Sequence, residues 1–209
     1  MGQKFFQILS ARKFEPLTVT AVTDYARFSI VAVGMPEADR PPLLIRYGTG
    51  GAWSAYEIGT LISLNKGEKC QIRNQSEVFS RSLAKYLHFS CGYTNDRMAL
   101  SGDLLALVNW RKDLPGYNFY RLFYNLKQLR EVPEIPDVPM EANAWSYSFA
   151  YCINLNKIRV NFKSWNGSAT NNWILGISTS GTFYKPSALP EERGGSRIPN
   201  NWKVVNPDE

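Results

Sequence analysis

The fold of this chain is decided by residues 145–158, which read WSYSFAYCINLNKI, because residues 119–132 (FYRLFYNLKQLREV) repeat their apolar pattern. A shift from 119 to 145 aligns the two stretches. Every large apolar position of one copy then meets an apolar residue of the other: Phe119 and Trp145, Phe123 and Phe149, Leu126 and Cys152, Leu129 and Leu155, and Val132 and Ile158. Repetition at one spacing indicates units that bury their apolar faces against each other.

A third, degenerate copy begins at Trp173, and a spacing of 28 residues places Ile177 and Phe183 at inward positions. This period lies within the roughly 20–29 residues of a leucine-rich-repeat unit. Each unit is predicted to contain a short helix or helical turn, then a short strand, then a variable loop. Tyr147, Tyr151 and Asn154 fall in the other register, so we expect them to be free for contact.

The N-terminal half has a different pattern, in which short apolar or β-branched runs are separated by turns. The predicted strands are residues 17–22, 26–33, 43–47, 60–64, 68–73 and 86–91. Glycine-containing segments at residues 48–51 and 65–67 predict hairpin loops. This succession favours a small antiparallel β-sandwich. Residues 103–110 (DLLALVNW) predict a short helix, so the fold class is mainly β with short helices.

Composition argues against two classes of partner. The formal net charge of +6 is spread along the chain without a block of like charges, whereas nucleic-acid binding needs a concentrated basic face. We therefore expect no nucleic-acid partner. No segment approaches the roughly 18 apolar residues of a membrane span, so we expect no membrane-spanning segment.

Catalytic and metal-binding patterns are not recognisable in the sequence. The three cysteines, Cys70, Cys91 and Cys152, are far apart, with no CxxC and only one histidine, His88. We interpret them as buried thiols, although a bridge between Cys70 and Cys91 stays open. His88 lies in a predicted strand and is interpreted as structural. No GxSxG or HExxH motif occurs, and we expect neither enzymatic activity nor a cofactor or metal.

Several motifs together resemble the BspA-like leucine-rich-repeat proteins of Bacteroidetes and their phages. Residues 44–56 (LIRYGTGGAWSAY) and 62–74 (ISLNKGEKCQIRN) are similar to the Ig-like β module of that family. Residues 147–155 (YSFAYCINL) match its repeat core, and residues 119–129 match it more loosely, with Leu126 at a usual Cys position. Residues 173–206 are similar to its terminal unit. The resemblance implies an attachment arm (1–15), an Ig-like β-sandwich (16–100) and a short leucine-rich-repeat domain with a C-terminal capping unit (101–209).

The family resemblance further implies a non-enzymatic surface for adhesion or display. No export signal is recognisable near the start, and a virion protein assembles in the host cytoplasm without one. We therefore expect a phage virion structural or adhesion protein, such as a fibre or capsid decoration component. Its expected partners are other capsid or tail proteins, further copies of itself, and a host surface protein or glycan. The alternatives are a bacterial cell-surface adhesin or glycan-binding module, and a purely architectural protein.

Candidate contact residues follow from these expectations. The loop KSWNGS (163–168) holds Trp165 and Asn166, and Trp165 is the aromatic residue that we expect to be most exposed. Tyr117, Tyr147 and Tyr151 are the further candidates for protein or glycan contact, and Trp110 and Tyr120 near Tyr117 are candidates for stacking on a sugar. We interpret Trp53 and Tyr56 as core or sheet residues. The candidate attachment residues are Lys4, Phe5, Phe6, Arg12 and Lys13.

Overall fold

The computed structural model describes residues 15–91 and 97–207, in which the regular elements are β-strands and two short 3-10 helices. The mainly β fold with short helices is thereby confirmed. The elements are β1 (Leu17–Ala21), β2 (Ala26–Val33), η1 (Glu37–Asp39), β3 (Leu43–Tyr47), β4 (Ser54–Ala55), β5 (Ile62–Leu64), β6 (Lys69–Asn74), β7 (Tyr86–Cys91), β8 (Met98–Ser101), η2 (Leu104–Val108), β9 (Lys157–Arg159), β10 (Thr182–Tyr184) and β11 (Lys203–Val205). The expected attachment residues between Lys4 and Lys13 lie outside the described part of the chain.

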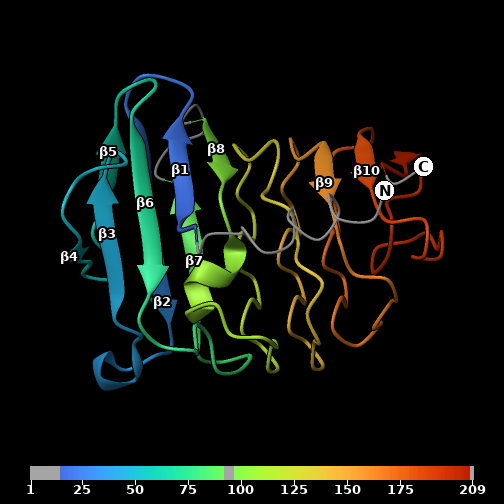
Figure 1. Ribbon diagram of the computed structural model, residues 1–209, viewed down its shortest axis with the longest axis horizontal. Coiled ribbons are helices and arrows are strands. Elements are labelled where there is room, and N and C mark those ends of the chain that lie inside the picture. The colour runs from blue at the N-terminus through green and yellow to red at the C-terminus, as the bar shows by residue number, and fades with distance from the viewer. Residues whose placement is uncertain (1–14, 92–96, 208–209) are drawn as a thin grey trace, which may run out of the picture.

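Two antiparallel sheets form the N-terminal half (Figure 1). One has the order β4-β3-β6-β1-β8, and the other has the order β5-β2-β7. In β2, Ala26, Phe28 and Ile30 are buried, while Arg27 and Ser29 between them are partly exposed. This alternation gives the strand one face for the core. The buried residues of both sheets belong to one hydrophobic cluster.

The two predicted hairpin loops have different outcomes. Residues 48–51 do connect an antiparallel pair, β3 and β4, in which Leu44 faces Ala55. Residues 65–67 instead join β5 to β6, which lie in different sheets, so that prediction is wrong. The turn packs against the end of β1, because the Gly67 N–H donates to the Ala21 carbonyl at 2.9 Å.

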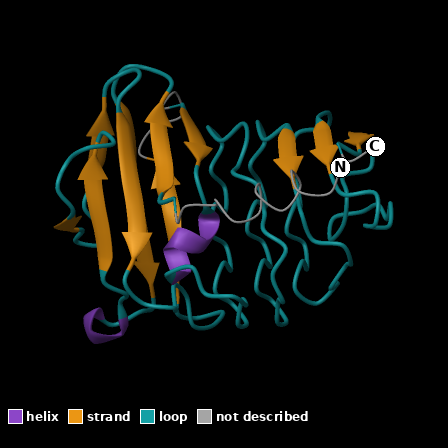
Figure 2. Cartoon of the chain, in the orientation of Figure 1, coloured by secondary structure: helices purple, strands orange, loops and turns teal. Residues whose placement is uncertain are grey.

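The C-terminal half winds into stacked coils that consist largely of turns (Figure 2). Alternate N–H groups of one coil donate to carbonyls of the next, as Phe119 does to Ala144 at 2.9 Å and Phe123 to Ser148 at 2.8 Å. The N–H groups between them close turns within their own coil, as Leu122 does on the Phe119 carbonyl at 3.2 Å. Each coil therefore depends on its neighbour for half of these backbone hydrogen bonds.

The helical turns predicted within the repeats are wrong. Residues 120–126 and 147–153 form consecutive turns, in which φ is 55° at Arg121, 58° at Asn125, 57° at Tyr147 and 63° at Tyr151. A right-handed helix requires negative φ at every residue, so a left-handed residue at every fourth position prevents it. The inward positions are nevertheless as predicted, because Phe123 and Phe149 stack with ring centres 5.7 Å apart.

The third coil follows sooner than the predicted 28 residues. Phe149 N–H donates to the Trp173 carbonyl at 2.8 Å, and Phe183 pairs with Ile158 in the parallel sheet β11-β10-β9. Asn172 and Gly176 take the left-handed positions of Tyr147 and Tyr151, so the buried Ile174 corresponds to Phe149. The placement of Ile177 at that position is therefore wrong, and Ile177 is only partly buried. Trp173 is buried as well, and its indole packs edge-to-face on Phe149 with ring centres 5.8 Å apart.

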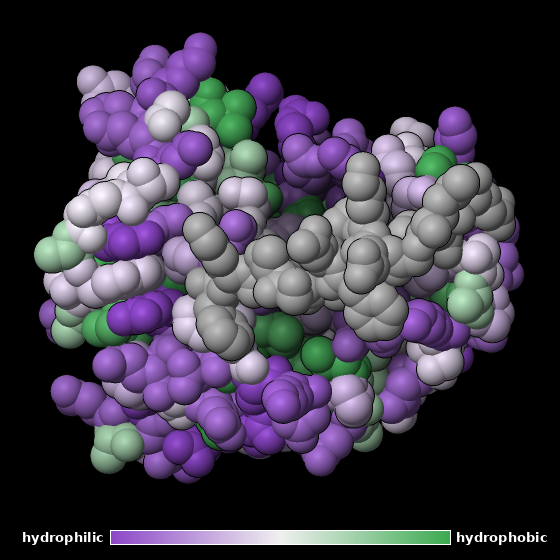
Figure 3. Space-filling model, viewed as in Figure 1, coloured by the Kyte–Doolittle hydropathy of each residue, from purple (hydrophilic) through white to green (hydrophobic). Residues whose placement is uncertain are grey.

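The sandwich and the coils share one hydrophobic core. Strand β7 covers the first coil, since the Phe89 N–H donates to the Leu122 carbonyl at 2.8 Å and the Phe89 ring lies 5.2 Å from that of Phe123. Figure 1 shows the strands of the sandwich at one end and β9 and β10 near the other. On the face drawn in Figure 3, the visible described residues are mainly hydrophilic, with hydrophobic residues only in small groups. No helix in the described residues has the length and apolar character needed to cross a bilayer.

Candidate functional site

Some of the residues with positive φ form an outward-facing column along the coils. They occupy corresponding positions in successive coils: Tyr117, Arg121 and Asn125, then Asn143, Tyr147 and Tyr151, then Asn172 and Gly176. Asparagine and glycine tolerate left-handed backbone well, whereas other residues pay about 1–2 kcal/mol for it. Tyrosine or arginine nevertheless occupies four of these positions. Backbone strain at side chains that face outward is a pointer to function.

Tyrosines of neighbouring coils contact each other along this column. Tyr120 lies edge-to-face against Tyr117 at 6.0 Å and against Tyr147 at 6.2 Å, measured between ring centres. Tyr124 packs in the same way on Tyr151 at 5.5 Å. Edge-to-face geometry is the favoured arrangement of aromatic pairs and holds the rings in place. Tyr120 is buried among them, while Tyr117, Tyr124 and Tyr147 stay partly exposed.

Arg121 lies at the centre of these rings. Its guanidinium carbon is 4.6 Å from the ring centre of Tyr124, 5.4 Å from Tyr120, and 5.8 Å from both Tyr86 and Tyr147. The Nη1 group also donates to the Tyr86 hydroxyl at 3.2 Å. Cation–π attraction to several rings fixes the position of the positive charge. We call the following seven residues the tyrosine–arginine face: Tyr86, Tyr117, Tyr120, Arg121, Tyr124, Tyr147 and Tyr151.

Asparagines of the following coil orient two tyrosines of this face. The Asn143 Nδ2 group donates to the Tyr117 hydroxyl at 3.3 Å, and the Asn172 Nδ2 group donates to the Tyr147 hydroxyl at 3.1 Å. The ring of Tyr151 is more open, with 41% of the residue exposed. The face therefore combines fixed rings with one ring that is free to contact a partner.

A groove of about 450 Å³ opens where the face meets strand β7. Its polar and charged lining side chains include His88, Arg121, Asn125, Lys127 and Gln128, and its aromatic lining includes Tyr86 and Tyr124. The described lining residues include no aspartate or glutamate. The groove thus offers cations, amides and aromatic rings together, within the usual size range of small-ligand sites.

The protonation states in the groove follow from burial and hydrogen bonding. Burial acts to lower the pKa of Arg121, but the Tyr86 hydrogen bond and the neighbouring tyrosines outweigh it and raise that pKa, so the guanidinium stays charged. Burial lowers the pKa of His88, which therefore favours the neutral ring. Its Nδ1 lies 3.1 Å from the Phe89 carbonyl, and since a carbonyl only accepts, Nδ1 carries the proton. The Nε2 atom is left as an acceptor.

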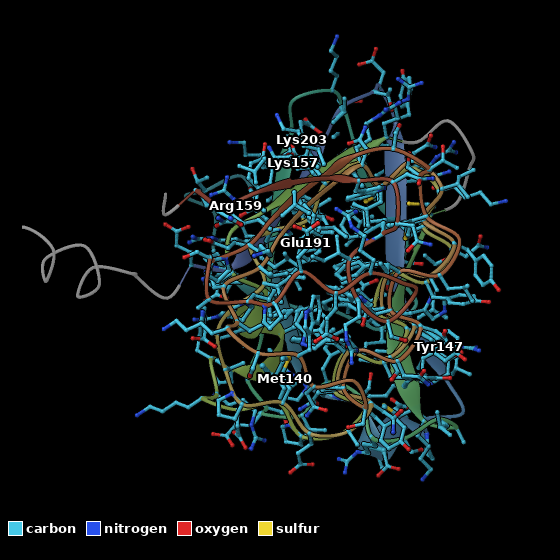
Figure 4. All side chains as sticks on the ribbon, turned by 90° about the vertical axis from the view of Figure 1, so that its right-hand side faces the viewer. Met140, Tyr147, Lys157, Arg159, Glu191 and Lys203 are labelled. Atoms are coloured by element: carbon cyan, nitrogen blue, oxygen red, sulfur yellow. The ribbon has the colours of Figure 1, made fainter. Side chains whose placement is uncertain are left out.

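Tyr117, Tyr147 and Tyr151 belong to the tyrosine–arginine face, and Figure 4 shows Tyr147 on the opposite side of the coils from Arg159. Asn154, expected to be free for contact, is exposed, but its Nδ2 group donates to the Lys127 carbonyl at 2.6 Å. These residues were expected to face outward because they alternate with the buried positions of the repeat.

The loop residue Trp165 is not the exposed contact that the sequence suggested. Its ring is half-buried and packs on Phe162 at 5.3 Å and Trp173 at 6.2 Å, and its Nε1 group donates to the Pro190 carbonyl at 2.8 Å. Asn166 also has a structural role, because its Nδ2 group donates to the Met140 carbonyl at 2.8 Å. The polar loop was misleading, since the apolar partners of Trp165 come from distant segments.

The two aromatic residues interpreted as sheet or core residues differ from each other. Tyr56 is buried, and its hydroxyl accepts from the Ile30 N–H at 3.0 Å and donates to the Thr60 carbonyl at 2.6 Å. Trp53 is half-exposed, with the guanidinium carbons of Arg46 and Arg73 4.7 and 4.5 Å from its ring centre. Both are therefore held by local packing.

The thiols are free, and two of them are buried. Cys70, Cys91 and Cys152 form no disulfide, so the bridge left open between Cys70 and Cys91 is not made. Burial raises the pKa of Cys70 to about 12 and that of Cys152 further, which keeps both thiols protonated at neutral pH. Within residues 15–91 and 97–207, no group of three or more His, Cys, Asp or Glu side chains is placed to hold a metal ion.

Three residues of the face were missed in the sequence: Tyr86, Arg121 and Tyr124. The sequence contained one signal for Arg121, because the repeat aligns this residue with the candidate Tyr147. Tyr86 comes from the sandwich, and no sequence spacing relates it to the coils.

Comparison of the chain with protein-family models, with curated proteins and with solved structures finds no match.

Proposed function

We propose that this protein is a non-enzymatic recognition protein that presents the tyrosine–arginine face to a protein or glycan as a component of a phage virion. The observation that carries the binding proposal is the outward column of left-handed residues. Tyr117, Arg121, Tyr147 and Tyr151 take a backbone conformation that glycine or asparagine would adopt with less strain. Side chains kept at such positions despite that cost are expected to serve contact rather than stability.

The composition of the face also suits recognition. Tyrosine and arginine are enriched where binding energy concentrates, because they offer large contact area together with hydrogen-bonding groups. The contacts of Tyr120 with Tyr117 and Tyr147 hold the rings in one arrangement before a partner arrives. A partner then loses less side-chain entropy on binding than it would with mobile side chains.

The virion part of the proposal rests on the resemblance to BspA-like proteins of Bacteroidetes phages. In this proposal the sandwich is the Ig-like module and the coils are a short array of BspA-type leucine-rich repeats. The partners are capsid or tail proteins and further copies of the chain, with a host surface protein or glycan at the outward face.

Binding by the face is tested with a double variant, Tyr147→Ser with Tyr151→Ser. The labelled protein is applied to a glycan array and to a panel of Bacteroidetes cells. We expect the wild-type protein to bind at least one of them and the double variant to bind at least tenfold more weakly. The matched control is Tyr184→Ser, because the Tyr184 ring also stacks under an arginine, Arg159, at 4.5 Å. Absence of wild-type binding, or equal binding by the double variant, contradicts the proposal.

The location is tested separately by mass spectrometry of purified phage particles. The protein is expected among the capsid or tail components, and its oligomeric state is expected to exceed a monomer in size-exclusion chromatography with light scattering. Recovery from the bacterial envelope and absence from particles would instead identify a cell-surface adhesin.

A further inference from the structure

We propose that the groove between β7 and the first coil binds a carboxylated sugar, with Arg121 as the carboxylate anchor. This inference rests on the proposed recognition function and names the ligand class for one part of the same face. It concerns the groove beside Tyr86 and Tyr124, whereas the double variant described above tests the tyrosines of the second coil.

The charge of the groove selects an anion. Arg121 and Lys127 both line it, and none of the described lining residues is acidic. Some basic residues elsewhere in the described chain pair with carboxylates, as Lys157 does with Glu131 at 2.7 Å and Arg111 with Asp113 at 2.9 Å. Neither Arg121 nor Lys127 has such a partner among the described residues. The two cations are therefore available to a ligand.

The guanidinium of Arg121 also has donors to spare. Among the described residues it donates one hydrogen bond, from Nη1 to Tyr86, out of five N–H groups. Its Nε atom is buried and has no acceptor in the described part of the chain, so the N–H groups that face a ligand belong to Nη1 and Nη2. The planar fork of arginine matches the two oxygens of a carboxylate better than it matches an isolated hydroxyl.

The other lining groups favour a sugar over a bare carboxylate. The partly exposed ring of Tyr124 offers an apolar surface to the C–H groups of a pyranose, whereas the Tyr86 ring is buried. The amide of the exposed Asn125 and the Nε2 acceptor of His88 suit sugar hydroxyls. A volume of about 450 Å³ lies in the range of sites that enclose small ligands. The geometry therefore fits one or a few sugar rings, of which one carries a carboxylate.

The experiment uses pairs of glycans that differ only in the acidic group. Oligosaccharides containing uronic or nonulosonic acids are placed on an array beside their carboxyl-reduced forms, and affinities are measured by calorimetry for the pairs that bind. We expect at least a tenfold preference for an acidic form over its reduced form. Arg121→Gln is expected to abolish this preference, and Arg121→Lys to retain only part of it, because lysine keeps the charge and loses the fork.

Arg159→Gln is the matched control, since Arg159 also lies over a tyrosine ring but on the opposite side of the coils (Figure 4). It should leave the preference unchanged. Circular dichroism and urea midpoints show whether each variant is folded. If Arg121→Gln does not fold, the comparison of Arg121→Lys with the wild-type protein still tests the inference. Three results would overturn the inference: equal binding of acidic and reduced glycans, an unchanged preference in both Arg121→Lys and Arg121→Gln, or binding only of acidic peptides. Neutral-glycan binding that is lost in Tyr147→Ser with Tyr151→Ser would overturn it too and leave the recognition function standing.

Discussion

Replacement of Phe149 by alanine is the perturbation that most directly tests the coil interior. Phe149 is fully buried, and its ring lies 5.7 Å from Phe123, 5.8 Å from Trp173 and 6.0 Å from Trp145. Phe→Ala in a packed core costs about 3–5 kcal/mol, and favourable ring pairs contribute about 0.5–1.5 kcal/mol beyond buried area. Because Phe149 contacts rings of both neighbouring coils, we expect a loss of about 4 kcal/mol.

The assay is urea unfolding followed by tryptophan fluorescence and circular dichroism. With a slope of about 2.5 kcal/mol per molar urea, the midpoint of Phe149→Ala should fall by roughly 1.6 M. The control is Tyr151→Ala in the same coil, which should lose less than about 1 kcal/mol because Tyr151 is 41% exposed. Both probes should report one transition, since Phe89 of the sandwich touches Phe123 of the coils. Equal midpoints for the two variants would refute the inward and outward assignment on which the site depends.

Three further predictions concern local stability, each measured by urea unfolding. Gly102→Ala should lose more than about 2 kcal/mol of stability, because φ is 84° and the added Cβ would meet the backbone. The control Gly48→Ala, with φ of 66° and open space around it, should lose about 1 kcal/mol. Equal losses in the two variants would contradict the close contact at Gly102. Asn74→Ala should lose about 2–3 kcal/mol, because its buried amide makes three backbone hydrogen bonds, and a loss below about 1 kcal/mol would refute this. Burial raises the pKa of Cys70 from 9.0 to about 12, so above pH 9 the unfolded chain releases this proton first and stability falls. From pH 8 to pH 10 this thiol should account for about 1.4 kcal/mol, and Cys70→Ala should remove that part of the pH dependence.

The sequence predicts the burial pattern of the coils better than their backbone. Phe123, Phe149 and Cys152 are identified as interior residues because the repeat places an apolar residue at each of them. The helical turns are predicted wrongly because local spacing cannot reveal that alternate N–H groups bond to a coil about 25 residues away in the chain, as from Phe123 to Ser148. Partners at such distances outweigh local helix propensity.

The candidate site is predictable only in part for a related reason. Tyr147 and Tyr151 follow from the repeat, because a residue between two buried positions faces outward. Tyr86 reaches the site through the packing of β7 on the first coil, a contact that no sequence spacing encodes. Trp165 shows the opposite error, since a polar loop around a tryptophan does not reveal distant apolar partners.

The backbone ladder between coils makes the length of this molecule adjustable. Each coil receives hydrogen bonds from the preceding coil and gives the same kind of bonds to the next, as Phe119 gives to Ala144 and Trp145 gives to Ala169. If a coil were inserted or deleted, the sandwich and β11 would therefore each still have a coil of the same type as its neighbour. Related chains could differ in reach by steps of about 4.8 Å, the spacing of hydrogen-bonded strands, while both ends stay unchanged.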